Sequence, residues 1–452
     1  MPETLPCFKA YDIRGRVPED LNEDLAYALG RAYAAEIAPD GPVAVGRDVR
    51  QTSEALAEAL ILGLNEGGAD TVYIGLCGTE MVYFAAGRAG MGGGIMVTAS
   101  HNPMDYNGFK LVRADAVPIS GDSGLKVLEK RVRTGDLGDK AATPGTNRTE
   151  DIAEAYTQKV VSFVDPSALK PLRIVANAGN GCAGPFLDRI AEHLPFEFIR
   201  LNHEPDGTFP NGIPNPLLAE NQPVTANAVR EHNADLGIAW DGDFDRCFFF
   251  DENGDFADGY YVVGLLAKRV LKDYPGAAII HDPRMVWNTV SIVNEAGGRA
   301  VQWKTGHAFM KEKMRAEDAA YGGEMSAHHY FRDFTYCDSG MIPWLLIAAL
   351  ISETGKPLSE HMAEGKRRFP GSGEINNTVE NPDATIEAIQ THFANSATSV
   401  EFVDGLSMAF GDVWRFNVRK SQTEPILRLN VETNGDPDLL KQKTNEILAM
   451  IN

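Results

Sequence analysis

The chain repeats one structural pattern three times, and this repetition limits the folds that it can adopt. In each round, a short apolar strand, an amphipathic helix and a second strand lead to a strand that ends in a dense polar loop. These loops follow residues 95–97, 236–240 and 320–322. Open α/β sheets carry their chemistry at the carboxyl ends of strands. The sequence therefore predicts an α/β fold with functional groups on three loops, and since the loops differ, it does not predict a tandem binding array.

The pattern changes near residue 370. The segments 406–410, 414–418 and 426–431 alternate between apolar and polar residues like the strands of an antiparallel sheet, and a helical pattern follows over 438–450. These segments predict a small C-terminal α+β domain with a polar loop of its own.

Turns and linkers divide the chain into candidate domains. At 452 residues it is too long for one typical hydrophobic core. Clusters of proline and glycine between the periodic segments mark the boundaries. We expect four domains, at 1–145, 146–253, 254–369 and 370–452.

Composition narrows the classes of function. The net charge of −21 argues against a nucleic-acid-binding surface, although a few arginines in a cleft can still attract an anionic substrate. The longest apolar run, 342–351, is about half the length that a membrane span needs, and the N-terminus does not resemble a secretory leader. The five cysteines are scattered and form no CxxC pair, which favours reduced thiols in the cytoplasm over structural zinc.

The first polar loop, the serine loop, runs from Thr98 to Pro103 and contains Ser100 and His101. A strand that stops in Ser-His-Asn-Pro places a hydroxyl on a turn at its carboxyl end, because Asn-Pro keeps the chain from continuing as a regular element. For a lone Ser-His pair, an ordinary turn with a capping serine is the simpler interpretation. The other loops therefore decide the meaning of this one.

The second polar loop, the aspartate loop, covers residues 241–246 and holds aspartates at alternate positions. In an extended loop Asp241, Asp243 and Asp245 point the same way, which suits a hard divalent cation such as Mg²⁺. Without a metal, like-charge repulsion makes such a cluster costly, and a solvated acidic turn is the alternative. A calcium helix–loop–helix motif is excluded, because Arg246 occupies the position that requires glycine. Arg246 is instead a candidate phosphate contact beside the metal.

Residues 179–184 form a G-x-G-x-x-G pattern between a strand and a helix, with Glu204 about twenty residues further on. This pattern favours a dinucleotide-binding fold that holds NAD. It leaves the serine loop, the aspartate loop and a C-terminal Arg-Ser-Thr loop unexplained, and close packing of a helix on a strand also requires glycines. NAD binding stays an alternative, which a nicotinamide fluorescence titration would test.

Two further loops carry groups that bind sugars and phosphates. Residues 323–329 offer a carboxylate, a hydroxyl and imidazoles that can hydrogen-bond a polyol, although a polar strand end is the simpler alternative. Residues 419–423 offer a guanidinium, two hydroxyls and an amide that can cradle a phosphate, although a hairpin loop can have the same composition. A phosphoryl group that moves between the serine and a sugar hydroxyl would use all four loops.

Four motifs, in this order, resemble those of the α-D-phosphohexomutases, and the resemblance covers essentially the whole chain. The motifs are residues 98–103, 241–246, 323–328 and 419–425. Within that family the chain is most similar to the bacterial phosphomannomutases. The resemblance implies four domains around a central cleft: three related α/β domains with mixed sheets and a C-terminal α+β domain.

The resemblance also implies a role for each matching residue. Ser100 matches the serine that carries a phosphoryl group, and its phosphate oxygen is an expected metal ligand. The expected Mg²⁺ ligands beside it are Asp241, Asp243 and Asp245. The further expected catalytic residues are Arg14, His101, Lys110 and Arg246, with Arg14 and Lys110 as candidates for proton transfer or charge stabilisation. The expected substrate-binding residues are Tyr11, Arg284, His307, Glu324, Ser326, His328, Arg419, Ser421, Gln422 and Thr423. Gln422 departs from the asparagine or glycine of close relatives, and we expect it to adjust the phosphate clamp without abolishing it.

The implied reaction is the reversible conversion of mannose 6-phosphate and mannose 1-phosphate, which supplies GDP-mannose synthesis. Phospho-Ser100 donates to the free hydroxyl, the resulting hexose 1,6-bisphosphate turns over in the cleft, and its other phosphate returns to Ser100. The expected cofactors are Mg²⁺ and the hexose 1,6-bisphosphate. We expect a cytoplasmic monomer or homodimer with hexose phosphates as partners and no nucleic-acid or membrane partner.

The choice of sugar stays open at this point. A phosphoglucomutase or a dual-specificity enzyme is the main alternative, because the difference between an axial and an equatorial hydroxyl is worth only about 1–3 kcal/mol. Phosphoglucosamine mutase is disfavoured by Met325 in the sugar-binding motif. A catalytically silent phosphosugar-binding protein on the same fold is a more distant alternative.

Overall fold

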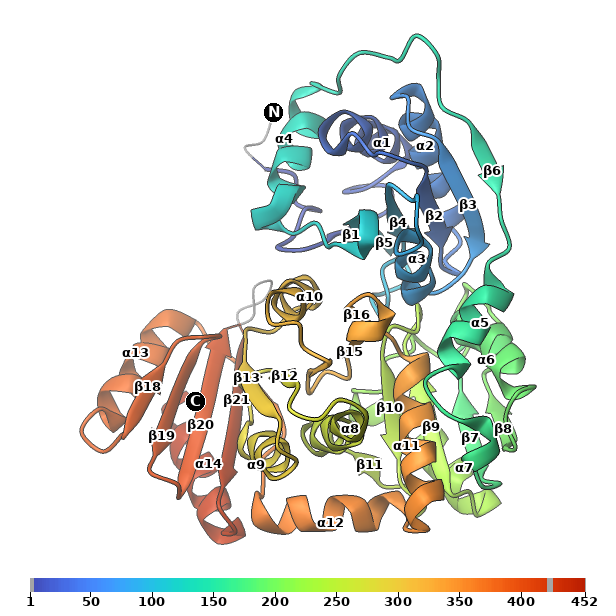
Figure 1. Ribbon diagram of the computed structural model, residues 1–452. Coiled ribbons are helices and arrows are strands. Elements are labelled where there is room, and N and C mark those ends of the chain that lie inside the picture. The colour runs from blue at the N-terminus through green and yellow to red at the C-terminus, as the bar shows by residue number, and fades with distance from the viewer. Residues whose placement is uncertain (1–3, 421–425, 452) are drawn as a thin grey trace. The chain divides into compact units, whose positions relative to one another are not determined.

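The computed structural model describes residues 4–420 and 426–451 (Figure 1). Contacts within the chain divide it into two compact units. The N-terminal unit comprises Met1–Phe256, Gly306–Arg315 and His328–Gly355, and the C-terminal unit comprises Ala257–Thr305, Ala316–Ala327 and Lys356–Asn452.

The N-terminal unit begins with a six-stranded mixed sheet in the order β1-β5-β4-β2-β3-β6. Its strands are β1 (Ile13–Arg16), β2 (Val43–Arg47), β3 (Thr71–Leu76), β4 (Gly93–Val97), β5 (Tyr106–Arg113) and β6 (Asn147–Thr149), and its helices are α1 (Glu23–Ile37), α2 (Ser53–Glu66), α3 (Thr79–Ala86) and α4 (Lys126–Thr134). Apolar residues of α1, α2 and α4 pack on Val45 and Ile95 at one face of the sheet. On the other face, Gly46 and Gly94 leave room for α3 (Figure 1).

Helices α1 and α2 approach each other more closely than their apolar pattern alone indicates. The Asn22 side chain caps α1 by accepting a hydrogen bond from the Leu25 amide at 3.0 Å. Where the helices cross, a Cβ at Gly63 would lie 2.1 Å from the carbonyl oxygen of Tyr27, and a Cβ at Gly30 would lie 2.3 Å from that of Leu60. Glycine is therefore required on both sides of this crossing.

The second sheet of the N-terminal unit is also mixed. Its strands pair in the order β10-β9-β7-β8, with β7 parallel to β8 and β9 and with β10 antiparallel to β9. The strands are β7 (Arg173–Asn177), β8 (Glu197–Leu201), β9 (Leu236–Trp240) and β10 (Cys247–Phe250), and the two-residue β11 (Phe256–Ala257) follows. The helices are α5 (Ala153–Val161), α6 (Ala183–Ala191) and α7 (Gln222–His232).

Two later segments complete the N-terminal unit. They form α10 (His307–Ala316), the antiparallel pair β15 (His329–Phe331) and β16 (Cys337–Asp338), and α11 (Met341–Thr354). Helix α11 contains the long apolar run, and its residues 341–352 are all buried, with Trp344 fully inaccessible. The apolar run is therefore a core helix. No helix among the described residues is long and apolar enough to cross a membrane.

The C-terminal unit contains a parallel sheet segment and an antiparallel sheet. Strand β12 (Ala278–His281) pairs in parallel with β13 (Arg299–Gln302) and β14 (Tyr321–Gly323), beside α8 (Gly259–Asp273), α9 (Trp287–Glu295) and α12 (Leu358–Arg368). The antiparallel sheet has the order β17-β21-β20-β19-β18. Its elements are β17 (Ile375–Thr378), β18 (Ser399–Glu401), β19 (Leu406–Phe410), β20 (Trp414–Lys420), β21 (Ile426–Thr433), α13 (Pro382–Phe393) and α14 (Pro437–Ile451).

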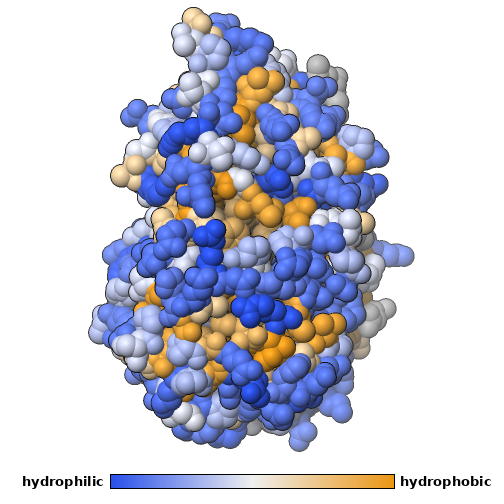
Figure 2. All heavy atoms as spheres, turned by 90° about the vertical axis from the view of Figure 1, so that its right-hand side faces the viewer, coloured by the Kyte–Doolittle hydropathy of each residue, from blue (hydrophilic) through white to orange (hydrophobic). Residues whose placement is uncertain are grey.

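The predicted fold class is confirmed. The strands alternate with helices up to residue 368, and an antiparallel sheet with helices follows, as the change of pattern near residue 370 indicates. The serine loop, the aspartate loop and the predicted sugar-binding loop (residues 323–329) lie at the carboxyl ends of β4, β9 and β14. The domain boundaries at 145, 253 and 369 stay a prediction. On the face shown in Figure 2, hydrophilic side chains predominate and apolar ones form small groups between them.

Candidate active site

The serine loop holds Ser100 in a constrained backbone conformation. Its φ is 51°, in the left-handed region that L-residues rarely adopt, and the residue is only 2% exposed. The Ser100 amide donates to Thr98 Oγ1 at 2.9 Å. The Ser100 hydroxyl donates to Asp241 Oδ2 at 2.7 Å. The loop thus presents one hydroxyl to the aspartate loop.

Two residues that the sequence analysis missed hold this loop. The Arg50 guanidinium donates to four carbonyl oxygens at distances of 2.6–3.0 Å: those of Ser100, Asn102 and Pro103 in the loop and that of Tyr106 at the start of β5. Asp48 accepts from the Thr98 hydroxyl at 2.7 Å and from the Arg50 amide at 2.9 Å. Both residues follow β2, which pairs with β4. Their position at the carboxyl edge of the sheet is the sequence feature that could have identified them.

Replacing Arg50 with methionine should lower kcat while leaving most of the fold intact. Methionine has similar length but donates no hydrogen bond, so four carbonyls lose their partner and the backbone of Ser100 is free to relax. We expect kcat to fall by about 10²-fold with a smaller change in KM, because a small misplacement of a reacting group can cost that much. Steady-state kinetics measure the effect. Arg47→Met is the matched control, since Arg47 binds the Tyr73 hydroxyl at 2.9 Å; equal losses in both variants would contradict the role of Arg50.

The aspartate loop gathers three buried carboxylates. Ligand atoms of Asp241, Asp243 and Asp245 all lie within 4.8 Å of one another. Cations lie beside them: Arg246 Nη2 is 2.6 Å from Asp241 Oδ2, and Lys110 Nζ is 2.7 Å from Asp243 Oδ2. The start of α3 fixes the loop as well, because the Thr79 amide donates to the carbonyl of Asp243 at 3.0 Å.

This acidic group could bind a metal ion. Oδ1 of Asp243 and Oδ1 of Asp245 are buried and accept no hydrogen bond from the described residues, so each has free ligand capacity. Burial and the neighbouring Asp243 raise the pKa of Asp245. For Asp243, burial opposes the charge, but Lys110 outweighs it and lowers the pKa. A divalent cation would relieve the repulsion between the carboxylates, and oxygen donors fit a hard ion.

The predicted catalytic cations lie at the serine and aspartate loops. Arg14 donates to Asp12 Oδ2 and to Asn102 Oδ1, both at 2.7 Å, and so reaches the serine loop. Burial opposes the charge of Lys110, but Asp243 and Asp245 outweigh it and raise its pKa. Lys110 is therefore a charged ammonium, suited to charge stabilisation.

The ring of His101 lies beside the serine hydroxyl. Its Nδ1 is 3.0 Å from Ser100 Oγ and also contacts Arg246 Nη2. Desolvation, followed by Arg246 and Arg14, lowers the pKa of His101 well below its usual value. The ring is therefore neutral and can accept a hydrogen bond.

Aromatic and imidazole rings form a cluster near the aspartate loop in the N-terminal unit. The rings of Tyr11 and His307 meet edge to face with centroids 4.9 Å apart, and those of His307 and His328 are 6.2 Å apart. His328 Nδ1 is 2.8 Å from Asp338 Oδ2 and 4.0 Å from Asp245 Oδ1. Both ring nitrogens of His307 are buried without a hydrogen-bond partner among the described residues. The imidazole of His307 therefore has hydrogen-bonding capacity for a polar ligand.

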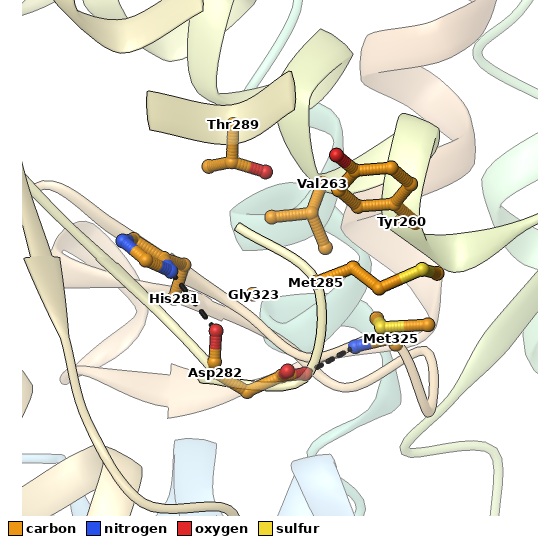
Figure 3. A pocket seen from close by; sticks show the side chains of 8 residues that line it. All are labelled: Tyr260, Val263, His281, Asp282, Met285, Thr289, Gly323 and Met325. Carbon is orange, nitrogen blue, oxygen red and sulfur yellow. Dashed lines mark hydrogen bonds between the residues drawn. The ribbon is translucent and has the colours of Figure 1, made fainter. Parts of the chain in front are cut away.

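In the C-terminal unit, Arg284 lies beside the predicted sugar-binding loop. Arg284 Nη2 is 2.6 Å from Asp282 Oδ2 and 3.5 Å from Ser326 Oγ. The same Asp282 oxygen accepts from the Met325 amide at 2.7 Å (Figure 3). Glu324 is 2% exposed and starts the turn, since its carbonyl accepts from the Ala327 amide at 3.0 Å. Asp282, which the sequence analysis did not identify, thus holds both predicted parts of the site.

Arg419 lies at the end of β20, where its Nη2 is 2.9 Å from Glu374 Oε2. Glu374 also contacts Arg284, so Arg419 and Arg284 share one carboxylate. Sequence reasoning missed Glu374 because it lies beside a linker. The predicted phosphate-binding residues Ser421, Gln422 and Thr423 lie outside the described residues.

The glycine-rich segment 179–184 packs against the aspartate loop. A Cβ at Gly181 would lie 2.7 Å from the carbonyl oxygen of Gly242, and the Cys182 amide donates to the same oxygen at 3.0 Å. A Cβ at Gly184 would lie 2.0 Å from the carbonyl oxygen of His203. Close packing therefore accounts for these glycines, and the pattern needs no dinucleotide to explain it.

The fold and these residues define a class of protein. A buried serine hydroxyl lies beside an acidic group that could bind a metal ion and beside two cations, at the edge of α/β sheets. Phosphoryl transfer relies on such positioning and charge neutralisation. The N-terminal unit therefore has the site of a phosphoryl-transfer enzyme.

Comparison with known proteins identifies the family. Models of the phosphoglucomutase/phosphomannomutase family match nearly the whole chain: alpha/beta/alpha domain I at residues 6–138, domain II at 154–254, domain III at 258–369 and the C-terminal domain at 374–450. The chain belongs to the phosphoglucomutase/phosphomannomutase family, with its four domains. It is therefore an enzyme, a mutase that transfers a phosphoryl group, and hexose phosphates fit this activity.

Individual relatives agree with this assignment. The chain is 56% identical over 448 residues to a protein named "Phosphohexose mutases" from Xanthomonas campestris pv. campestris (strain B100), with 99% of each chain covered. It is 55% identical over 454 residues to a phosphomannomutase from Salmonella montevideo, again with 99% of each chain covered. A crystal structure of a phosphoglucomutase/phosphomannomutase family protein from Burkholderia thailandensis superposes with a TM-score of 0.87 at 32% identity, covering 98% of this chain and 97% of the other.

Proposed function

We propose that this protein is a phosphomannomutase, which interconverts mannose 6-phosphate and mannose 1-phosphate through a phosphorylated Ser100 and a hexose 1,6-bisphosphate. Relatives named phosphomannomutase that are 50%, 52% and 55% identical support the choice of sugar. The observation that carries the reaction is the buried Ser100 hydroxyl, 2.7 Å from Asp241 Oδ2 and 3.4 Å from Arg246 Nη2. A nucleophile beside a cation and an acidic metal site is what a phosphoserine intermediate requires.

Different residues around Ser100 assist the transfer of the phosphoryl group from Ser100 and its return to Ser100. When phospho-Ser100 donates, phosphorus bonds to the sugar hydroxyl oxygen as its bond to Oγ breaks. The Arg246 guanidinium stabilises the charge on Oγ until Oγ takes up the proton that the sugar hydroxyl releases. When Ser100 takes up the second phosphate, phosphorus bonds to Oγ as its bond to the sugar oxygen breaks. The proton of the Ser100 hydroxyl ends on that sugar oxygen, and the two acceptors in contact with Oγ that can relay it are Asp241 Oδ2 and His101 Nδ1. The ammonium of Lys110 adds positive charge on the aspartate side.

Asp241, Asp243 and Asp245 would hold the Mg²⁺ ion that this reaction uses, with an oxygen of phospho-Ser100 as a further ligand. When bound, Mg²⁺ polarises the phosphoryl oxygens as a Lewis acid. The other predicted residues bind the substrate: Glu324 and Ser326 grip the sugar hydroxyls, and Arg419 holds the phosphate that is not being transferred. If the same groups hold the sugar in two orientations, Ser100 can exchange a phosphoryl group with either the 1-position or the 6-position of the hexose.

Turnover of mannose 1-phosphate and glucose 1-phosphate, measured side by side, tests the proposal. Both assays contain Mg²⁺ and a trace of hexose 1,6-bisphosphate, which phosphorylates Ser100. A strong preference for the mannose substrate supports a phosphomannomutase, whereas equal rates would make the protein a dual-specificity mutase. Binding of both sugars without turnover would contradict enzymatic activity and leave a phosphosugar-binding protein.

Arg419→Ala should raise KM more than it lowers kcat. The substitution removes a charge-assisted hydrogen bond to the substrate phosphate, a contact worth about 1.5–3 kcal/mol, which corresponds to a rise in KM of about 10- to 100-fold. Phosphorylation of Ser100 by the bisphosphate should change less, because Ser100 and its neighbours are intact. Arg299→Ala, at a half-exposed arginine paired with Glu317, is the control. A loss confined to kcat would contradict phosphate binding by Arg419.

A further inference from the structure

A half-buried carboxylate lies among the arginines of the proposed phosphate site. Glu374 Oε2 is 2.9 Å from Arg419 Nη2 and 3.3 Å from Arg284 Nη1, and Glu374 Oε1 is 3.5 Å from Arg428 Nη1. The Glu374 side chain is 18% exposed and that of Arg284 is 4% exposed. One carboxylate therefore bridges guanidinium groups that would otherwise repel one another.

The backbone next to Glu374 is fixed, so that its side chain is the part free to move. Ser372 exchanges hydrogen bonds with Val431 of β21: its amide donates to the Val431 carbonyl, and its hydroxyl accepts from the Val431 amide, both at 2.9 Å. The carbonyl of Gly373 accepts from Asn430 Nδ2 at 2.9 Å. Rotation about the side-chain bonds of Glu374 can withdraw its carboxylate without disturbing these contacts.

The arginines around Arg419 already face carboxylates before any ligand enters. The guanidiniums of Arg284, Arg419 and Arg428 face the carboxylates of Glu374, Asp282 and Asp404, the last at 3.7 Å from Arg419 Nη1. A phosphate dianion added to this group brings two further negative charges into a poorly solvated place, and withdrawal of one carboxylate offsets one of them.

Of the three carboxylates, Glu374 is the one suited to leave. Asp282 also accepts from the Met325 amide, and Asp404 also accepts from the Thr305 amide at 3.2 Å, so both have structural roles elsewhere. The contacts of Glu374 are with the arginines themselves. The Nε atoms of Arg284, Arg419 and Arg428 are buried without a hydrogen-bond partner among the described residues. A phosphate offers more acceptor oxygens than a carboxylate and can satisfy such donors.

At neutral pH, protonation does not release the Glu374 carboxyl group from the arginines. Burial by itself raises the pKa of Glu374, but Arg284, Arg419 and Arg428 outweigh it and hold the value at about 2. The Glu374 carboxylate therefore carries one negative charge. A monoanion in its place would be attracted to the arginines no more strongly than the carboxylate is.

We propose that Glu374 is a specificity-determining residue, whose carboxylate occupies the position of a phosphate between Arg284 and Arg419 in the substrate-free enzyme. A phosphomonoester dianion displaces it, whereas a monoanion does not. The inference rests on the proposed function, which assigns phosphate binding to Arg419.

Titration of the whole protein with unreactive ions tests this inference. Calorimetry at pH 8 compares inorganic phosphate, a dianion, with nitrate, a monoanion. In Glu374→Gln, phosphate should bind about tenfold more tightly, a gain of about 1.4 kcal/mol, and nitrate should become a detectable ligand. Glu374→Asp keeps the charge but shortens the side chain, so a smaller gain is expected. Asp383→Asn is the matched control, since it removes one charge from an exposed pair with Lys420.

A second substitution locates the site of any gain. In Glu374→Gln combined with Arg419→Met, the gain in phosphate affinity should disappear. Unchanged or weaker phosphate binding in both Glu374 variants would overturn the inference and make Glu374 a permanent support for the arginines. A gain that persists without Arg419, or that Asp383→Asn reproduces, would overturn it too. Because no turnover is measured, these outcomes are separate from those of the mutase assay.

Discussion

Ser100→Ala is expected to abolish turnover of hexose phosphates. The substitution removes the oxygen that takes and returns the phosphoryl group, so no partial reaction remains, and kcat should fall by at least about 10⁴-fold, as for other enzymes that lose their nucleophile. The fold should change little. Asp241 keeps its contact with Arg246 at 2.6 Å, and one lost hydrogen bond costs about 1 kcal/mol of the free energy of unfolding.

Two measurements separate loss of the phosphoryl carrier from a general defect. After incubation with hexose 1,6-bisphosphate and Mg²⁺, the wild-type mass should rise by one phosphate that maps to Ser100, and the mass of the variant should not. Ser162→Ala is the control, because Ser162 donates only to the nearby carbonyl of Lys159 among the contacts described. Near-normal turnover by Ser100→Ala, or a phosphate that maps to another residue, would contradict the assignment.

Sequence reasoning located the loops because their chemistry follows strands. Ser100 and Asp241 follow strands of two different sheets, and the argument that chemistry gathers at the carboxyl ends of strands applies to each. That Ser100 Oγ lies 2.7 Å from Asp241 Oδ2 did not follow from the pattern. The resemblance to a family paired the two loops, and the structure of the N-terminal unit supplies the distance.

The residues that escaped prediction act through backbone groups or through other side chains. Arg50 binds carbonyl oxygens, which every residue has, so no motif in the serine loop identifies its partner. Glu374 follows a linker, and its meaning depends on arginines from three distant segments. Gly63 faces Tyr27 across a helix crossing whose geometry the apolar period does not determine. Long-range contacts of these kinds need coordinates.

Asp243→Asn is expected to remove both metal binding and activity. Asparagine keeps the shape of the side chain but replaces a charged ligand with a neutral amide, and its NH₂ group can face Lys110, which lies 2.7 Å from Asp243 Oδ2 in the native protein. Loss of one such electrostatic contribution typically lowers kcat by about 10²–10³-fold. The free Oδ1 of Asp243 and of Asp245 is the structural reason to expect a bound ion in the native protein.

Thermal unfolding with and without Mg²⁺ reports metal binding independently of catalysis. An ion that binds only the folded state stabilises it by about 2.7 kcal/mol at a hundredfold excess over Kd, so the Tm of the wild type should rise with Mg²⁺ and fall back with a chelator. The shift should vanish in Asp243→Asn. Asp251→Asn is the matched control, because Asp251 is 2% exposed and binds the turn amides of Asn253 and Asp255. That control should lose stability at all Mg²⁺ concentrations yet keep the shift. A Mg²⁺-dependent Tm in Asp243→Asn equal to that of the wild type would place the metal elsewhere and remove the aspartate loop from the mechanism.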